Sequence, residues 1–95
     1  MYLRIGNNFM VRKSAILGIF DLDNATWSHW TRKFLNGMEA QGRVVNAAME
    51  EIPNSFLLCE ENGIQRVYLS MLTVQTLQKR AKESIFTEKP GLGSE

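Results

Sequence analysis

SFLLCEENGIQRVYLS, residues 55 to 70, carries the strongest fold signal in the chain. Two runs of strand-forming residues, 55–60 and 65–70, flank a loop that contains the dipeptide Asn62-Gly63. Asn and Gly tolerate the positive φ angles that the tightest β-hairpin turns require. The stretch therefore predicts two antiparallel strands joined by a short turn.

Short strands are also predicted on the N-terminal side of this hairpin. Strand formers at the start of the chain are interrupted by Gly6-Asn7-Asn8, a tight-turn signal that predicts a second hairpin. The run AILGIFDL, residues 15–22, is typical of a buried strand, with Gly18 at a point where another backbone approaches closely. The complete set of predicted strands is 2–5, 9–12, 15–22, 43–48, 55–60 and 65–70.

A first helix is predicted between the third and fourth of these strands. Asp23, Asn24 and Thr26 are suited to cap its start, and Gly42 to end it. Apolar residues at intervals of three and four fall on one face of this helix, namely Trp27, Trp30, Phe34 and Met38. We expect this face to lie in the core or at a subunit interface; the alternative is that the two tryptophans stack on nucleobases.

A second helix is predicted from an N-cap at Thr73 to Lys82, with Val74, Leu77 and Ala81 facing inward. The order βββαβββα predicts an α+β fold, a small antiparallel-sheet domain with one long and one short helix. We assign residues 1–82 to a single domain. The Gly- and Pro-bearing remainder, 83–95, is predicted to be a flexible C-terminal tail.

The bulk composition is that of an ordinary soluble domain, since 44% of the 95 residues are hydrophobic and 22% are charged. No apolar run approaches the roughly 20 residues needed to cross a bilayer. The opening MYLRIGNNF lacks the zones of a signal peptide. We therefore expect a cytoplasmic protein with no membrane partner.

Few residues are suited to catalysis. The single histidine, His29, falls on the polar flank of the predicted first helix, and Asp21 and Asp23 are explained as helix-capping residues. The pair Glu50-Glu51 admits proton or metal chemistry, a solvated turn, or a binding surface given negative charge. Cys59 is expected to be a small core hydrophobe. We predict no enzymatic activity, no catalytic residues, no cofactor and no metal site.

Self-association is expected from the shape of the predicted domain. A sheet of short strands with one long helix to cover it leaves a second face and at least one edge to be hidden. Copies of the same chain are the simplest cover for such surfaces. We therefore expect a homo-oligomer.

Positive charge is spread along the predicted domain. Residues 1–82 hold ten of the eleven Lys and Arg residues and seven of the ten Asp and Glu residues, a net charge of +3. In a symmetric assembly each cation is repeated once per subunit, so weak contacts with a polyanion become avid. The candidates for phosphate contacts with double-stranded DNA are Arg12, Lys13, Arg43, Arg66 and Arg80.

Five segments in this order and spacing resemble the RemB branch of the RemA/RemB family of extracellular matrix regulators from spore-forming bacteria: MYLRIG, ILGIFDLDN, QGRVVN, PNSFLLCE and VYLSMLTVQTLQKRAK. The resemblance extends to about Lys82. It implies a small α+β domain whose subunits pair like a LytTR-type DNA-binding fold and close into a ring. It also implies transcriptional regulation of biofilm matrix genes, since the RemA branch activates such genes and holds the phosphate backbone with arginines.

Three positions depart from the RemA branch. Where RemA-like chains carry arginines, this sequence has Ala15, Glu51 and Ile52. The Glu51 carboxylate would repel phosphates. Arg12 and Lys13, a few residues before Ala15, have side chains long enough to reach a neighbouring phosphate instead.

Two functional hypotheses follow. The first is a ring-forming, RemB-like regulator that binds double-stranded DNA through its phosphate backbone. The second is a non-enzymatic oligomeric scaffold or interaction protein of the same fold that has lost DNA binding. In the second, the acidic loop engages a basic partner or a RemA-like relative.

Overall fold

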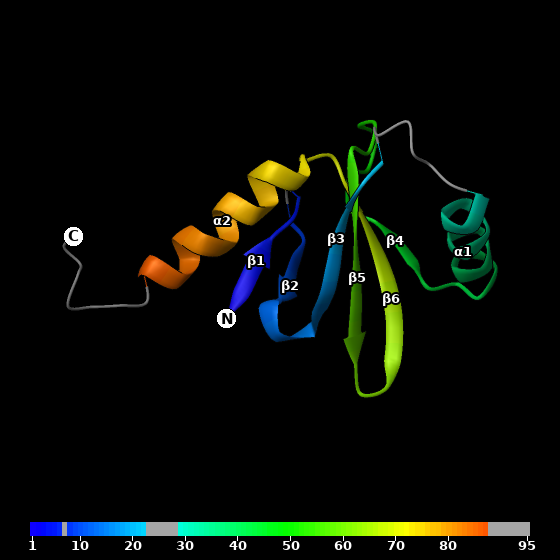
Figure 1. Cartoon of the computed structure of the whole chain (residues 1–95), viewed down its shortest axis with the longest axis horizontal. Coiled ribbons are helices and arrows are strands. Elements are labelled where there is room, and N and C mark those ends of the chain that lie inside the picture. The colour runs from blue at the N-terminus through cyan, green and yellow to red at the C-terminus, as the bar shows by residue number, and fades with distance from the viewer. Residues whose placement is uncertain (7, 23–28, 88–95) are drawn as a thin grey trace.

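The computed structural model describes residues 1–6, 8–22 and 29–87, and of 83–87 the backbone alone. Within these described residues, two helices and two small sheets give an α+β fold, as predicted (Figure 1). In chain order the elements are β1 (Tyr2–Arg4), β2 (Met10–Arg12), the 3-10 helix η1 (Lys13–Ala15), β3 (Ile16–Asp21), α1 (His29–Ala40), β4 (Val44–Asn46), β5 (Ser55–Glu61), β6 (Ile64–Ser70) and α2 (Val74–Thr87).

The β5–β6 hairpin forms the centre of a four-stranded sheet with the strand order β3-β5-β6-β4. Its antiparallel register pairs Ser55 with Ser70 at one end and Glu61 with Ile64 at the other. Asn62 and Gly63 adopt φ angles of 56° and 80°, the left-handed conformation expected of an Asn-Gly turn. The predicted hairpin is confirmed, as is the shorter antiparallel hairpin of β1 and β2.

The four-stranded sheet is mixed, which corrects the prediction of a purely antiparallel sheet. β4 runs parallel to β6, with Val44 opposite Val67 and Asn46 opposite Leu69. The connection from β3 to β4 contains α1 and returns the chain to the end of the sheet where β3 began. A crossover of this kind makes β4 run in the same direction as β3. Because β3 and β6 are both antiparallel to β5, β4 is also parallel to β6.

β3 is an edge strand, not the buried strand that was predicted. Its Leu17 and Phe20 side chains are 57% and 45% exposed. The position of Gly18 is explained by its own strand: a Cβ atom there would lie 2.8 Å from the ring of Phe20. The prediction that another backbone approaches Gly18 is therefore wrong, and the neighbour is an aromatic side chain two residues further on.

Two apolar clusters cover the two faces of the sheet. On one face, β5 residues Leu57 and Cys59 pack with the β1–β2 hairpin and with Leu77 of α2. On the other face, Phe56 and Val67 pack with Met38 of α1, and the side chains alternate between faces as strand geometry requires. Figure 1 shows the hairpin and α2 on one side of the sheet and α1 on the other. The premise that one helix alone covers the sheet was thus wrong.

The apolar face predicted for α1 is corrected by the structure. Leu35 and Met38 pack on the sheet, whereas Trp30 is 75% exposed and Phe34 37% exposed. Trp30 therefore does not lie in the core of the single chain. The remaining residues predicted for this helix start, Asp23, Asn24, Thr26 and Trp27, lie outside the described residues.

The predicted end of α1 at Gly42 and the predicted start of α2 at Thr73 are both present. Gly42 has φ of 71°, and the amides of Gly42 and Arg43 donate to the carbonyls of Glu39 and Met38, the paired bonds of a glycine C-cap. The Thr73 hydroxyl oxygen accepts the amide hydrogen of Thr76 at 3.1 Å, which confirms Thr73 as the N-cap of α2. The backbone of α2 continues to Thr87, beyond the predicted end at Lys82.

Candidate nucleic-acid interface

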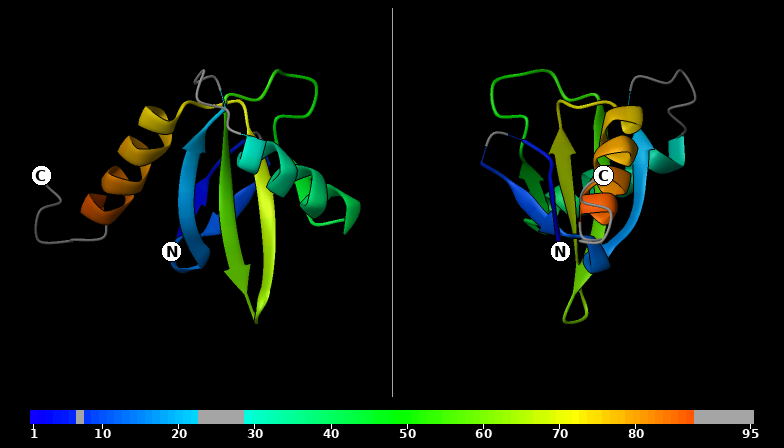
Figure 2. Two further views of the ribbon diagram at one scale, coloured as in Figure 1. Left: turned by 45° about the vertical axis from the view of Figure 1, so that its right-hand side comes forward. Right: turned by 90° about the vertical axis from the view of Figure 1, so that its left-hand side faces the viewer.

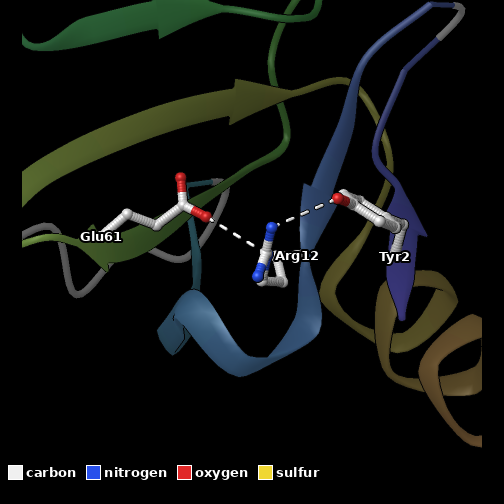
Figure 3. A network of polar contacts seen from close by, with 3 residues as sticks. All are labelled: Tyr2, Arg12 and Glu61. Carbon is white, nitrogen blue, oxygen red and sulfur yellow. Dashed lines mark hydrogen bonds and ion pairs between the residues drawn. The ribbon is translucent and has the colours of Figure 1, made fainter.

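Arg12 is held by two neighbours at the end of β2. Its Nε lies 3.6 Å from Oε2 of Glu61, and its guanidinium donates a long hydrogen bond of 3.5 Å to the Tyr2 hydroxyl (Figure 3). The guanidinium carbon also lies 5.8 Å from the centre of the Tyr2 ring, within cation–π range. The strongest sequence candidate for a phosphate contact therefore already has an anionic partner inside the protein.

The surroundings of Arg12 form an open polar pocket of about 440 Å³. Its walls are Arg12, Ser14, Ala15, Glu60, Glu61 and Asn62. The Glu61 carboxylate faces the Arg12 guanidinium, whereas Glu60 precedes Glu61 on β5 and so has its side chain on the opposite face of the sheet. A phosphate that approaches Arg12 must therefore compete with the Glu61 carboxylate.

Lys13 has a structural contact. Its ammonium donates a hydrogen bond of 2.7 Å to the backbone carbonyl oxygen of Ala81, and this contact is partly buried. The bond ties η1 to α2, two segments that are far apart in the sequence. Lys13 is therefore less free to reach outward than its position in the sequence suggests.

The other candidate cations come from three different elements. Arg66 is exposed on β6 opposite Cys59, on the same face as Glu61, which follows Cys59 by two residues on β5. Arg80 is exposed on α2, and Arg43 is half-buried just before the edge strand β4. The fold thus brings Arg12 and Arg66 to the same end of the sheet. Arg43 lies beside Arg66 on the neighbouring strand, since the Val67 amide donates to the Arg43 carbonyl at 2.9 Å and Val44 is opposite Val67.

The positions where the RemA branch has arginines lie at opposite ends of the sheet. Ala15 is 5% exposed and directly precedes the start of β3. Glu51 and Ile52 lie in the loop before β5, at the end of β3, where the Leu22 amide donates to the Asn54 carbonyl. Figure 2 shows this loop at the top of the sheet and η1 at the bottom. Within one subunit these positions therefore do not make one surface.

The loop between β4 and β5 is built to present its side chains to solvent. The Asn46 side-chain oxygen accepts the amide hydrogens of Ala48 and Met49 at 3.1 and 3.2 Å, and its nitrogen donates to the Met49 carbonyl. Met49 has a φ of 57°, which is uncommon for a residue with a side chain. Met49 and Ile52 are 59% and 81% exposed, and the two glutamates between them are exposed as well.

Cys59 is a buried thiol on β5. Burial and, secondly, the carboxylate of Glu61 raise the pKa of the Cys59 thiol to about 11. Because the thiolate is the reactive form, this cysteine is inert near neutral pH. The prediction of a small core residue is confirmed by an exposed fraction of 4%.

The acidic and catalytic candidates do not come together in a metal-binding group among the described residues. No group of three or more His, Cys, Asp or Glu side chains there is placed to hold a metal ion. His29 is exposed and contacts the edge of the Trp30 ring, with ring centres 6.2 Å apart. Asp21 lies opposite Ser55 at the end of β3, and Asp23 is outside the described residues. Neither α1 nor α2, as far as each is described, has the length and apolarity of a membrane span.

Sequence reasoning missed the residue that most affects the candidate interface, Glu61. No local pattern connects it to Arg12, because the contact joins two strands of different sheets. Exposed Phe20 and Met49 were missed for a similar reason, since apolar residues in strand-like and loop segments give no sign of which ones remain uncovered. The sequence signal that could have pointed to an acidic partner for Arg12 was the pair Glu60-Glu61, directly before Asn62-Gly63.

The fold and surface define a small α+β protein with an exposed acidic loop and with exposed cations on several elements, of which Arg12 is paired with Glu61. Residues 2–81 match the family model RemA-like, described as extracellular matrix regulatory protein A-like. The chain belongs to this RemA-like family. It is also 33% identical to extracellular matrix regulatory protein B of Bacillus subtilis (strain 168) over 82 residues, 86% of this chain and 91% of that relative. The family resemblance found in the sequence is confirmed.

Proposed function

We propose that this protein is a non-enzymatic, cytoplasmic regulator of extracellular matrix genes that binds DNA as a homo-oligomer. The observation that carries the proposal is the family match, which spans residues 2–81 and so includes both sheets and most of α2. A relative named extracellular matrix regulatory protein B, covered over 91% of its length, supports the regulatory role. Regulation of biofilm genes and transcription is the proposed form of that role.

The DNA contacts are proposed to be phosphate contacts from Arg12, Arg66 and Arg80, with smaller contributions from Lys13 and Arg43. Arg12, Arg66 and Arg80 are exposed, so their guanidinium groups can approach a polyanion. Each subunit supplies few cations, and Arg12 is already paired with Glu61. Affinity is therefore expected to depend on repetition of these groups in the assembly and to fall steeply with salt.

The assembly is proposed to be a ring in which subunits pair in a LytTR-like manner. Two features support self-association: the outer strands β3 and β4 are edges of the four-stranded sheet, and large apolar side chains stay exposed on several elements. A ring also offers a way to combine the region around Ala15 of one subunit with the loop around Glu51 of another. Within one chain these regions lie at opposite ends of the sheet.

A salt titration of DNA binding tests this function. Fluorescence anisotropy with a labelled duplex is measured from about 50 to 200 mM salt for the wild-type protein and for Arg12→Ala, Arg66→Ala and Arg80→Ala. We expect each substitution to weaken binding similarly for unrelated duplexes and to reduce the salt slope by about one. Glu39→Ala, at an exposed position of α1, serves as a control substitution that removes no cation. Absence of duplex binding at the lowest salt concentration contradicts the DNA-binding function.

One observation favours a second candidate, a scaffold or interaction protein that does not bind DNA. The loop that carries arginines in the RemA branch here exposes Met49, Glu50, Glu51 and Ile52, an apolar and acidic set suited to a basic protein surface. A RemA-like relative in a mixed assembly is the proposed partner. Pulldown from lysate with and without nuclease separates the two functions, because a partner held through DNA is lost after nuclease treatment and a directly bound partner is retained.

A further inference from the structure

The face of the sheet that packs on α1 is only partly covered. α1 lies over β4 and β6, where Leu35 and Met38 pack against Val67. Towards the β3 edge of the same face, Phe20 is stacked on Phe56 at 4.9 Å between ring centres but remains 45% exposed. An apolar strip of β3 and β5 therefore lies open beside α1.

α1 itself has an apolar flank that its own sheet does not use. Trp30 and Phe34, four residues apart on the helix, are 75% and 37% exposed. A helix flank of this kind and an open apolar sheet face are the two halves of an ordinary helix-on-sheet contact. One chain thus presents both halves, and each lies on the same side of the sheet.

The charges beside these two surfaces are opposite in sign. Lys33 is exposed on α1 between Trp30 and Phe34 in the sequence. Glu60 is exposed on β5, and because it follows Leu58 by two residues it lies on the same face as Leu58 and Phe20. The helix flank is therefore cationic at its rim, and the open sheet strip is anionic at its end.

We propose that a second copy of this chain covers the open strip, with Trp30 and Phe34 of each copy packed on Phe20 and Leu58 of the other. Lys33 of one copy then faces Glu60 of its neighbour. Each chain carries both the helix flank and the open sheet strip. A two-fold axis therefore packs the flank of each copy on the strip of the other, and the contact is isologous. The inference rests on the proposed self-association and names the contact within one pair of subunits; closure of such pairs into a ring uses a different contact.

The apolar area is sufficient for the centre of such an interface. Aromatic side chains bury about 150–250 Å² each, so the exposed parts of Trp30, Phe34 and Phe20 amount to roughly 300 Å² per copy. Two copies supply about 600 Å² of apolar surface, against a total of ~1,200–2,000 Å² for a stable interface. The rest is expected from the polar rim around Lys33 and Glu60.

Light scattering after size-exclusion chromatography tests the interface. We expect the wild-type protein at micromolar concentration to be an oligomer, and Trp30→Ala and Phe20→Ala to shift it to a smaller species. Ile64→Ala is the matched control, since Ile64 is 41% exposed on β6 but opposite Glu61, away from the α1 side. The mass of the assembly formed by Ile64→Ala is expected to equal that of the wild type.

A charge exchange separates loss of the interface from loss of folding. Lys33→Glu and Glu60→Lys alter only exposed side chains, and each is expected to weaken association about tenfold. The double variant should recover to within about threefold of the wild type. Recovery supports the proposed contact, and a double variant as weak as the two single ones overturns it.

The remaining outcomes distinguish this inference from the proposed function. A wild-type monomer overturns both the interface and the proposed assembly. An oligomer whose mass is unchanged by Trp30→Ala and by Phe20→Ala overturns the interface alone. An oligomer that responds as expected but binds no duplex DNA leaves the interface in place and removes the DNA-binding function.

Discussion

The Nε atom of Arg12 lies 3.6 Å from the Oε2 atom of Glu61, so the cation best placed by sequence to meet a phosphate is paired with an acid of its own chain. Both side chains are about half exposed, 55% for Arg12 and 44% for Glu61. A pair this exposed stabilises the fold little, because water screens it. Its larger effect is expected on anions that approach Arg12.

Glu61→Gln should strengthen DNA binding. The substitution removes a negative charge beside Arg12 and leaves the shape of the side chain, so a phosphate no longer competes with a carboxylate. We expect an affinity gain of about threefold at low salt, measured by anisotropy, because an exposed pair is worth less than about 1 kcal/mol. Glu39→Gln on α1 is the control. Unchanged affinity in Glu61→Gln would show that Arg12 does not meet phosphate.

Lys13→Met should destabilise the protein. It removes the 2.7 Å hydrogen bond to the Ala81 carbonyl and with it the link between η1 and α2. We expect a loss of about 1–2 kcal/mol in the free energy of unfolding, measured by urea denaturation. Lys13→Arg should retain most of the stability, and Lys79→Met, at an exposed position on α2, should have little effect. Equal stability of Lys13→Met and wild type would contradict the structural role.

Asn46→Ala should loosen the loop between β4 and β5. Three hydrogen bonds join the Asn46 side chain to the backbone of Ala48 and Met49 and hold Met49 at its positive φ. Their loss is expected to cost about 1–2 kcal/mol and to increase amide hydrogen exchange in the loop. Asn46→Asp keeps the oxygen that accepts the two amide hydrogens and should lose less. Identical exchange in all three proteins would refute this account.

The Cys59 thiol should resist alkylation until strongly alkaline pH. Its pKa is about 11 in the folded protein, above the ordinary value of 9.0, so the folded state retains the proton that the unfolded state releases. Stability should therefore decline as pH rises from about 9 to about 11. Iodoacetamide labelling measured by mass spectrometry, with and without urea, checks this. Rapid labelling of the folded chain at pH 8 would contradict the buried thiol.

The elements that sequence predicted correctly depend on neighbouring residues. Asn62-Gly63 adopts its turn, Gly42 ends α1 and Thr73 caps α2 because each signal acts on backbone groups a few residues away. The same holds for the inward position of Leu77, which follows from helical spacing after Thr73. The family, too, was evident from the order of segments along the chain.

The features that the sequence predicted incorrectly depend on which other part of the fold each helix or strand packs against. Helical spacing placed Trp30, Phe34 and Met38 on one face, but α1 meets the sheet with Leu35 and Met38, so the aromatic pair is left outside. The direction of β4 was likewise decided by the crossover through α1, not by any residue of β4. Periodicity defines the faces of an element, and only packing selects which face is buried.

The sequence by itself determined the class of the fold, its turns and caps and its membership of the RemA-like family, since these are written in local spacing and in the order of segments. Only the tertiary structure decided that Arg12 is paired with Glu61, that Lys13 holds α2, and that Phe20 and Trp30 stay exposed. These relationships join segments that are distant along the chain. No local propensity encodes such contacts, because they form only when the sheet, the hairpin and the helices pack together.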